Sequence, residues 1–134
     1  MQLNVTTDYG IRVILYLAQK NDIASSKEIC EKTGIPPSYM HKIARTLKKA
    51  GMINEIRGSK GGFKLKKEPN KLTILAIISA FEKTININRC LEADQLCSRY
   101  ATIDCKVREL YTEIQTELHN RLDVNVATFL NESD

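Results

Sequence analysis

A glycine turn between a short helix and a basic amphipathic helix constrains the fold of this chain more than any other feature. Residues 25–33 (SSKEICEKT) predict a short helix, because Ser25 with Glu28 three residues later forms a capping-box pattern. Gly34 ends this helix, and two prolines then lead into a second helix over residues 38–50. The apolar stripe of the second helix consists of Met40, Ile43, Ala44 and Leu47. The pattern predicts a helix-turn-helix motif.

Two short alternating segments follow this motif and flank a basic stretch rich in glycine. Residues 52–56 (MINEI) and 63–66 (FKLK) alternate apolar and polar side chains, as strands do. Residues 57–62 (RGSKGG) lie between them and predict the basic tip of a hairpin. A phosphate-binding loop is the alternative, but no helix follows and the GK[ST] arrangement is absent. The chain therefore predicts a wing beside the helix-turn-helix.

Two further helices are predicted around this unit. Residues 7–20 carry one apolar face, and Thr6 or Thr7 is the expected cap of that helix. Residues 74–81 form an apolar stretch that follows Thr73, which is the expected cap. Because this second helix is almost entirely apolar, we expect it to pack on the first.

A long helix is predicted from Cys105 to about Asp123, with apolar side chains along one side. In so small a protein that side predicts the interface of a homodimer, and packing on the same chain alone is the alternative. The predicted fold class is mainly α with a small β-hairpin wing. We divide the chain into a winged helix-turn-helix DNA-binding domain (residues 1–83), a cysteine-rich cluster-binding loop (84–104), and a dimerisation helix with a C-terminal tail (105–134).

Basic residues concentrate in the first half of the chain. Residues 1–70 carry 13 basic and 6 acidic side chains, a net charge of +7. Residues 71–134 carry 7 basic and 10 acidic side chains, a net charge of −3. A basic front and an acidic back indicate one face that meets a polyanion.

Double-stranded DNA is the predicted partner of this basic face. The start of a recognition helix usually reaches base edges, and an arginine on a wing suits a narrow minor groove. A solvated charged face and a winged helix that binds protein are the alternatives. A two-fold dimer with one wing per subunit predicts a palindromic operator. The residues expected to contact DNA are Ser38, Tyr39, His41, Lys42 and Arg45 on the helix, with Arg57 and Lys60 on the wing.

Three of the four cysteines, Cys90, Cys97 and Cys105, crowd into one segment without clean periodicity. Structural disulfides are not expected in a cytoplasmic chain, and the Cys-x-x-Cys pairs typical of zinc sites are absent. Three thiolates in one loop, with Cys105 at a helix start, can instead hold an iron–sulfur cluster. The alternatives are a disulfide formed on oxidation and three incidental cysteines. Cys30 is expected to fill a space in the core.

Membrane proteins and enzymes are disfavoured classes. No apolar run approaches the roughly 18–20 residues of a membrane span, and Arg12 interrupts the first apolar stretch, so neither a membrane partner nor a signal peptide is predicted. A cytoplasmic location is expected. The two histidines, His41 and His119, form no recognisable nucleophile–base pair, so no catalytic residue is predicted.

Further residues of the chain form a distinctive set: Thr7-Asp8-Tyr9-Gly10-Ile11-Arg12, Tyr16-Leu17-Ala18, Ile35-Pro36, Tyr39-Met40, Leu47, Ala50-Gly51, Arg57-Gly58, Gly61-Gly62-Phe63, Leu65, Pro69 and the three clustered cysteines. Through these residues the chain resembles the Rrf-type bacterial winged helix-turn-helix transcriptional regulators, including their IscR-like and NsrR-like members. The resemblance spans residues 1–130, although the cysteine spacings are somewhat wider than usual in that family.

The resemblance implies a homodimeric DNA-binding regulator, expected to be a repressor, that senses redox state, nitric oxide or iron. Cys90, Cys97 and Cys105 would hold a 2Fe–2S or 4Fe–4S cluster whose state controls promoter binding. A cluster-free regulator controlled by cysteine thiol oxidation or a small ligand is the alternative.

A fourth cluster ligand differs between subgroups of this family. IscR-like members use a histidine shortly after the third cysteine, where this chain has Lys106-Val107-Arg108. NsrR-like members use an aspartate in the first helix of the partner subunit, and Asp8 stands in the matching place. The resemblance therefore implies Asp8 as the fourth ligand. The alternative roles of Asp8 are a helix N-terminal carboxylate and an ion-pair partner of Arg12.

Overall fold

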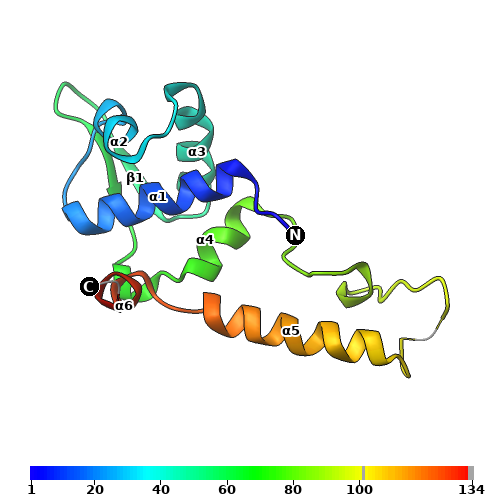
Figure 1. Ribbon diagram of the computed structural model, residues 1–134. Coiled ribbons are helices and arrows are strands. Elements are labelled where there is room, and N and C mark those ends of the chain that lie inside the picture. Colours follow the sequence, from blue (N-terminus) through cyan, green and yellow to red (C-terminus); the bar gives the residue numbers. More distant parts are fainter. Residues whose placement is uncertain (101, 133–134) are drawn as a thin grey trace.

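The computed structural model describes residues 1–100 and 102–132 as a winged helix-turn-helix joined to a long helix (Figure 1). The remaining residues, 101, 133 and 134, belong to the predicted cysteine-rich loop and C-terminal tail and lie outside the described residues. The elements are α1 (Val5–Lys20), α2 (Ser26–Thr33), α3 (Pro37–Lys49), β1 (Ile53–Ile56), β2 (Gly62–Leu65), a 3-10 turn (Pro69–Lys71), α4 (Ile74–Phe81), a second 3-10 turn (Arg89–Leu91), α5 (Lys106–Leu122) and α6 (Val126–Glu132). The mainly α fold with a hairpin wing is confirmed.

The short-range signals of the helix-turn-helix are confirmed. The Ser25 hydroxyl accepts a hydrogen bond from the backbone N–H of Glu28 at 3.1 Å and caps α2. Gly34 ends α2 with φ 74°, a left-handed conformation that glycine adopts without steric cost. Helix α3 begins at Pro37, one residue earlier than predicted, because proline suits the first position of a helix.

One core holds the three N-terminal helices, α4 and the hairpin together. Its fully buried side chains include Ile14, Leu17, Ile43, Leu47 and Ile77. Helix α4 packs on α1 as predicted, and Thr73 caps α4 by accepting a hydrogen bond from the N–H of Ala76. Cys30 packs against this core from a half-buried position, in agreement with its predicted role.

The wing is a two-stranded antiparallel hairpin that is anchored to the loop before α2. Strands β1 and β2 pair Ile53 with Leu65 and Ile56 with Gly62. The backbone of Phe63 exchanges two hydrogen bonds with the backbone of Ala24, at 2.8 and 3.0 Å. The wing therefore has a fixed position beside α2.

The predicted start of α1 is wrong. Helix α1 begins at Val5 with Asn4 as its N-cap, and neither Thr6 nor Thr7 occupies that position. The side chain of Asn4 forms no capping hydrogen bond with the first turn of the helix. The carboxylate of Glu82, 78 residues away in the sequence, instead accepts a hydrogen bond from the backbone N–H of Asn4 itself.

Helix α6 was not predicted from the sequence. The N–H of Val126 donates to the carbonyl of Leu72 at 2.8 Å, and the N–H of Ile74 donates to the carbonyl of Val124 at 3.0 Å. Val126 is fully buried in the shared core. The segment after α5 therefore returns to the start of α4, and Figure 1 shows α6 beside the winged unit.

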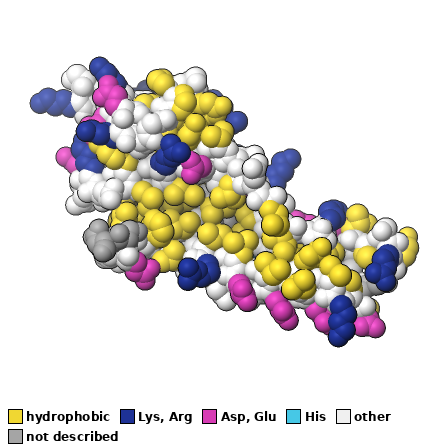
Figure 2. Space-filling view, viewed as in Figure 1, with side chains coloured by type: hydrophobic (Ala, Val, Ile, Leu, Met, Phe, Trp, Pro, Cys, Tyr) yellow, Lys and Arg dark blue, Asp and Glu magenta, His cyan; other side chains and the backbone are white. Residues whose placement is uncertain are grey.

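Helix α5 carries the predicted apolar row, and much of that row is exposed. Val107, Leu110 and Ile114 are 51%, 52% and 44% exposed. Figure 2 shows hydrophobic side chains in a band that continues from the middle of the molecule over α5. Within the described part of the chain, no helix has both the length and the apolar character needed to cross a membrane.

The prediction for the wing concerns Gly62, whose φ is 154°. A Cβ atom there would lie 2.3 Å from the carbonyl oxygen of Ala24. We expect Gly62→Ala to lower the free energy of unfolding by about 2–3 kcal/mol, because backbone on both sides resists the shift. Urea denaturation measures this value. Gly58→Ala is the control, since Gly58 also has a positive φ (113°) but open space around it. Equal losses in both variants would contradict the steric argument.

Candidate DNA-binding surface and cysteine cavity

All seven residues predicted to contact DNA are exposed. Helix α3 supplies Ser38, Tyr39, His41, Lys42 and Arg45, and the loop between β1 and β2 supplies Arg57 and Lys60. Figure 1 shows α3 and the wing on the side of the molecule away from α5. This arrangement leaves the basic face open to a large polyanion.

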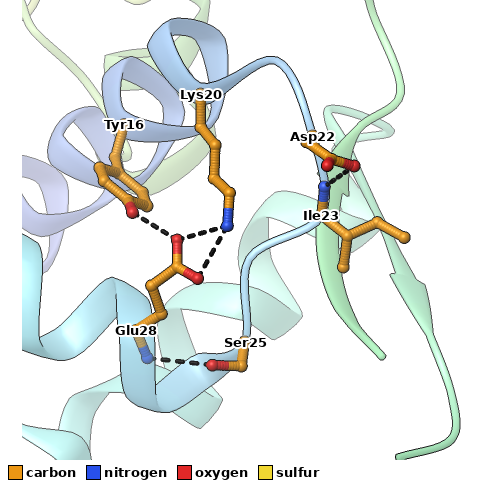
Figure 3. A network of polar contacts seen from close by, with 6 residues as sticks. All are labelled: Tyr16, Lys20, Asp22, Ile23, Ser25 and Glu28. Atoms are coloured by element: carbon orange, nitrogen blue, oxygen red, sulfur yellow. Dashed lines mark hydrogen bonds and ion pairs between the residues drawn. The ribbon is translucent and has the colours of Figure 1, made fainter. Parts of the chain in front are cut away.

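A polar network fixes α2 against α1 (Figure 3). The carboxylate of Glu28 accepts hydrogen bonds from the ammonium of Lys20 at 2.6 and 2.7 Å and from the hydroxyl of Tyr16. These donors, Lys20 first, hold the pKa of Glu28 below its ordinary value, and the Glu28 carboxylate raises the pKa of Tyr16. Since the lowered pKa favours the carboxylate, all of these hydrogen bonds are present when the pH is above the ordinary pKa of glutamate. It is lost only as the pH falls through the lowered value.

Tyr39 at the start of α3 is held by α1. The rings of Tyr9 and Tyr39 meet edge to face with centroids 5.3 Å apart. The guanidinium of Arg12 lies 5.2 Å from the centroid of the Tyr9 ring, and it donates a hydrogen bond to the carbonyl of Thr33 at 3.0 Å. Arg12 also pairs with Asp8 at 2.8 Å, which agrees with one of the alternative roles given to Asp8.

The three clustered cysteines line one cavity. Cys90, Cys97 and Cys105 are half-buried and surround a space of about 230 Å³ beside the start of α5. Cys105 is the N-cap of α5, as its predicted place at a helix start requires, and its sulfur accepts a weak hydrogen bond from the N–H of Arg108 at 3.4 Å. The sulfur of Cys90 accepts a hydrogen bond from the side-chain amide of Asn88 at 3.2 Å.

The described residues do not form a closed metal centre. No group of three or more His, Cys, Asp or Glu side chains among them is close enough to hold a metal ion. Asp8 lies on α1, outside the lining of the cysteine cavity of its own chain. The structure thus brings the three cysteines to one cavity and does not bring Asp8 to it.

Sequence reasoning missed the arginines of this cavity. Arg89, Arg99 and Arg108 all line it. Arg108 donates a hydrogen bond from Nε to the carbonyl of Cys90 at 3.3 Å, so this one residue contacts both Cys90 and Cys105. Arg89 forms an ion pair with Asp94, which raises the pKa of Arg89 and lowers that of Asp94. The position of Arg108, three residues after a helix cap, was the available signal.

Gln115 on α5 was also missed, and it holds the segment that leads to Cys90. Its side-chain oxygen accepts a hydrogen bond from the N–H of Ile87 at 2.7 Å, and its side-chain nitrogen donates to the carbonyl of Ile85 at 2.9 Å. Only 7% of Gln115 is exposed. Both polar groups of the amide are therefore satisfied by backbone on the opposite segment.

The prediction for this contact is a loss of local protection. We expect Gln115→Leu to leave the two backbone groups without partners and to cost about 2–4 kcal/mol of unfolding free energy. We also expect the backbone N–H of Ile87 to exchange its hydrogen with solvent faster than in the wild type. Gln115→Glu is the matched control, since a carboxylate still accepts from Ile87 and cannot donate to Ile85. Unchanged protection of Ile87 in Gln115→Leu would contradict the assigned contact.

Comparison with known proteins gives the family of this fold and site. Residues 3–132 match the Rrf2 family, which is described as iron-dependent transcriptional regulators. An HTH-type transcriptional regulator of Aquifex aeolicus strain VF5 is 31% identical over 116 residues, which cover 86% of this chain and 81% of that relative. The HTH-type transcriptional regulator NsrR of Shouchella clausii is 32% identical over 96 residues, which cover 70% of this chain and 64% of the relative.

Solved structures agree with this assignment. CymR, described as the global cysteine regulator of B. subtilis, superposes with a TM-score of 0.82 at 25% identity and covers 100% of this chain and 99% of its own. IscR of T. potens has a TM-score of 0.75 at 23% identity, covers 100% of this chain and 89% of its own, and shows a likeness in fold. These relatives are named as regulators and not as enzymes. The chain belongs to the Rrf2 family of transcriptional regulators.

Proposed function

We propose that this chain is a DNA-binding regulator whose affinity for its operator is set by an iron–sulfur cluster at Cys90, Cys97 and Cys105. The observation that carries the proposal is the convergence of these three cysteines on one cavity at the start of α5. The match to a family described as iron-dependent supports it. Such a cluster would react with oxidants and nitric oxide, and its assembly would depend on the supply of iron.

The chemistry of the cavity fits an anionic cluster. Thiolates are the ligands that iron–sulfur clusters require, and three sulfur donors lie on its walls. Arg99 and Arg108 supply positive charge beside them, which offsets the negative charge of several thiolates. Because the sulfurs do not form a closed metal group in this conformation, loading requires the loop to tighten around the cavity.

Asp8 of the partner subunit is the fourth ligand in this proposal. Its carboxylate is exposed on α1, where a second chain has access to it. Its present partner is Arg12, which would have to release it. A carboxylate ligand leaves one iron open to exchange, and that lability suits a sensor.

Thiol oxidation without a cluster is the second candidate. The likeness to CymR, which is described as a global cysteine regulator, favours it. Two of the three thiols would lose two electrons and two protons to an oxidant such as hydrogen peroxide and form a disulfide.

Iron and acid-labile sulfide analysis of protein purified without oxygen separates the two candidates. We expect coloured wild-type protein that contains iron and sulfide, and colourless Cys90→Ala, Cys97→Ala and Cys105→Ala variants. Cys30→Ala is the matched control, since Cys30 packs against the core and should retain the wild-type colour. Asp8→Ala should keep iron and lose it faster to a chelator. Wild-type protein without iron and sulfide after reconstitution would contradict the cluster, and a peroxide-induced disulfide would then favour the thiol candidate.

The regulator acts, in this proposal, as a dimer on a palindromic operator. The exposed apolar row of α5 gives a second copy a surface to cover, and a two-fold pair then presents two α3 helices and two wings. The seven exposed residues of α3 and the wing contact the DNA. Each half-site would lie about one helical turn from the other.

Salt dependence of DNA binding tests the proposed surface. We expect Lys42→Ala and Lys60→Ala each to weaken binding to a labelled duplex and to reduce the slope of log K against log salt by about 1.8, the value for one lost phosphate contact in each subunit of the dimer. Lys71→Ala is the control, because Lys71 lies in the 3-10 turn before α4 and pairs with Glu68. Fluorescence anisotropy measures both quantities. Equal slopes for all three variants and the wild type would contradict this surface.

A further inference from the structure

The carboxylate of Glu82 joins the cysteine segment to the helix that holds the recognition helix. Its Oε1 atom accepts hydrogen bonds from the backbone N–H of Asn4 at 2.7 Å and from the hydroxyl of Thr7 at 2.8 Å. Its Oε2 atom accepts from the side-chain amide of Asn4 at 3.0 Å. A negative charge is stabilising at this end of α1, because the helix dipole places partial positive charge there. Thr7 is 0% exposed, so at least one of these bonds is shielded from water.

The same residue is the point at which the cysteine segment begins. Glu82 is the C-cap of α4 and donates its backbone N–H to the carbonyl of Ile78 at 2.9 Å. Its extended backbone then leads directly into the stretch that ends at Cys105. The backbone of Glu82 therefore ends α4, and its carboxylate forms hydrogen bonds with the start of α1.

The stretch that follows Glu82 is a folded unit that includes Cys90. The hydroxyl of Thr84 donates to the carboxylate of Glu92, and the side-chain amide of Asn86 donates to the carbonyl of Leu91. Residues 84–92 are thus bonded across their own ends, and we refer to them as the 84–92 unit. Cys90 lies inside this unit, and the unit starts two residues after Glu82.

Helix α1 carries the effect onward to α3. Tyr9 lies two residues after Thr7 and packs against Tyr39 at the start of α3. Because Val13, Ile14 and Leu17 of α1 are buried in the core, α1 responds as a rigid element. A change at the 84–92 unit therefore has a short, bonded route to the recognition helix.

We propose that Glu82 is the positioning residue that couples the state of the cysteine cavity to the orientation of α1 and α3. The inference rests on the proposed sensing function. Two arrangements of the 84–92 unit would differ in whether the Glu82 carboxylate holds the first turn of α1, and DNA affinity would follow that difference.

The test is the ratio of DNA affinities between two states of the cysteine cavity, measured on one duplex at one salt concentration. The states are iron-loaded and chelator-stripped protein, or reduced and peroxide-treated protein when no iron is bound. We expect a wild-type ratio of about 5- to 150-fold, the usual range for coupled sites, and a ratio below about threefold for Glu82→Gln. The amide side chain keeps the size of glutamate and loses the charge.

Two further variants keep the test decisive. Thr7→Val removes one of the bonds with little change in shape, and should give an intermediate ratio even where Glu82→Gln folds poorly. Glu68→Gln is the control, because Glu68 is an exposed carboxylate paired with Lys71 and should keep the wild-type ratio. A merely structural role of Glu82 would lower the melting temperature of both states and leave the ratio unchanged.

The outcomes distinguish the inference from the function on which it rests. A responsive wild type with an equally responsive Glu82→Gln variant would overturn the coupling and leave the sensing intact. A wild type with equal affinity in both verified states would overturn the sensing and the coupling together. A collapsed ratio in Glu82→Gln, with the iron content or thiol chemistry of the wild type, supports the coupling.

Discussion

The burial of one face of α1 is the interaction on which the rest of the structure depends. Val13, Ile14 and Leu17 are at most 1% exposed, and α1 contacts α2, α3, α4, α6 and β2. Burying each such side chain contributes roughly 1.5–3 kcal/mol, more than a typical surface contact. Gly10 allows the end of α4 to approach α1 closely, since a Cβ atom there would lie 2.3 Å from the Phe81 ring. The recognition helix and the wing take their positions from this one helix.

Features of the fold that depend on neighbouring residues could be predicted from the sequence. Ser25 and Thr73 cap helices as expected, and Gly34 ends α2, because each effect acts within one turn. The start of α1 could not be predicted, since Glu82, its hydrogen-bond acceptor, is distant in the sequence. Helix α6 is seven residues long and is held by backbone bonds to the start of α4, a tertiary contact that a short periodic pattern does not encode.

In the candidate site, too, local features could be predicted from the sequence and long-range contacts could not. The three cysteines were recognisable by residue type and crowding, and the structure brings them to one cavity. Arg108 and Gln115 were not recognised, because their partners are backbone groups of a segment without periodicity. The exposure of the five α3 residues predicted to contact DNA followed from the amphipathic pattern of that helix, in which every buried position falls on the opposite stripe. Long-range polar contacts are therefore what sequence reasoning lacks here.

The unequal anchoring of the cysteines determines how a change in the cavity can spread. Cys105 is fixed as the N-cap of α5, and Arg108 bonds both its sulfur and the carbonyl of Cys90. Cys97 lies between Gln95 and Tyr100, two non-glycine residues with positive φ, in a stretch without helix or strand. The carbonyl of Cys97 accepts a hydrogen bond from the N–H of Tyr100 at 3.0 Å, a contact within its own turn. Cys90 belongs to the 84–92 unit, so in the proposed coupling its displacement would be the one transmitted through Glu82 to α1.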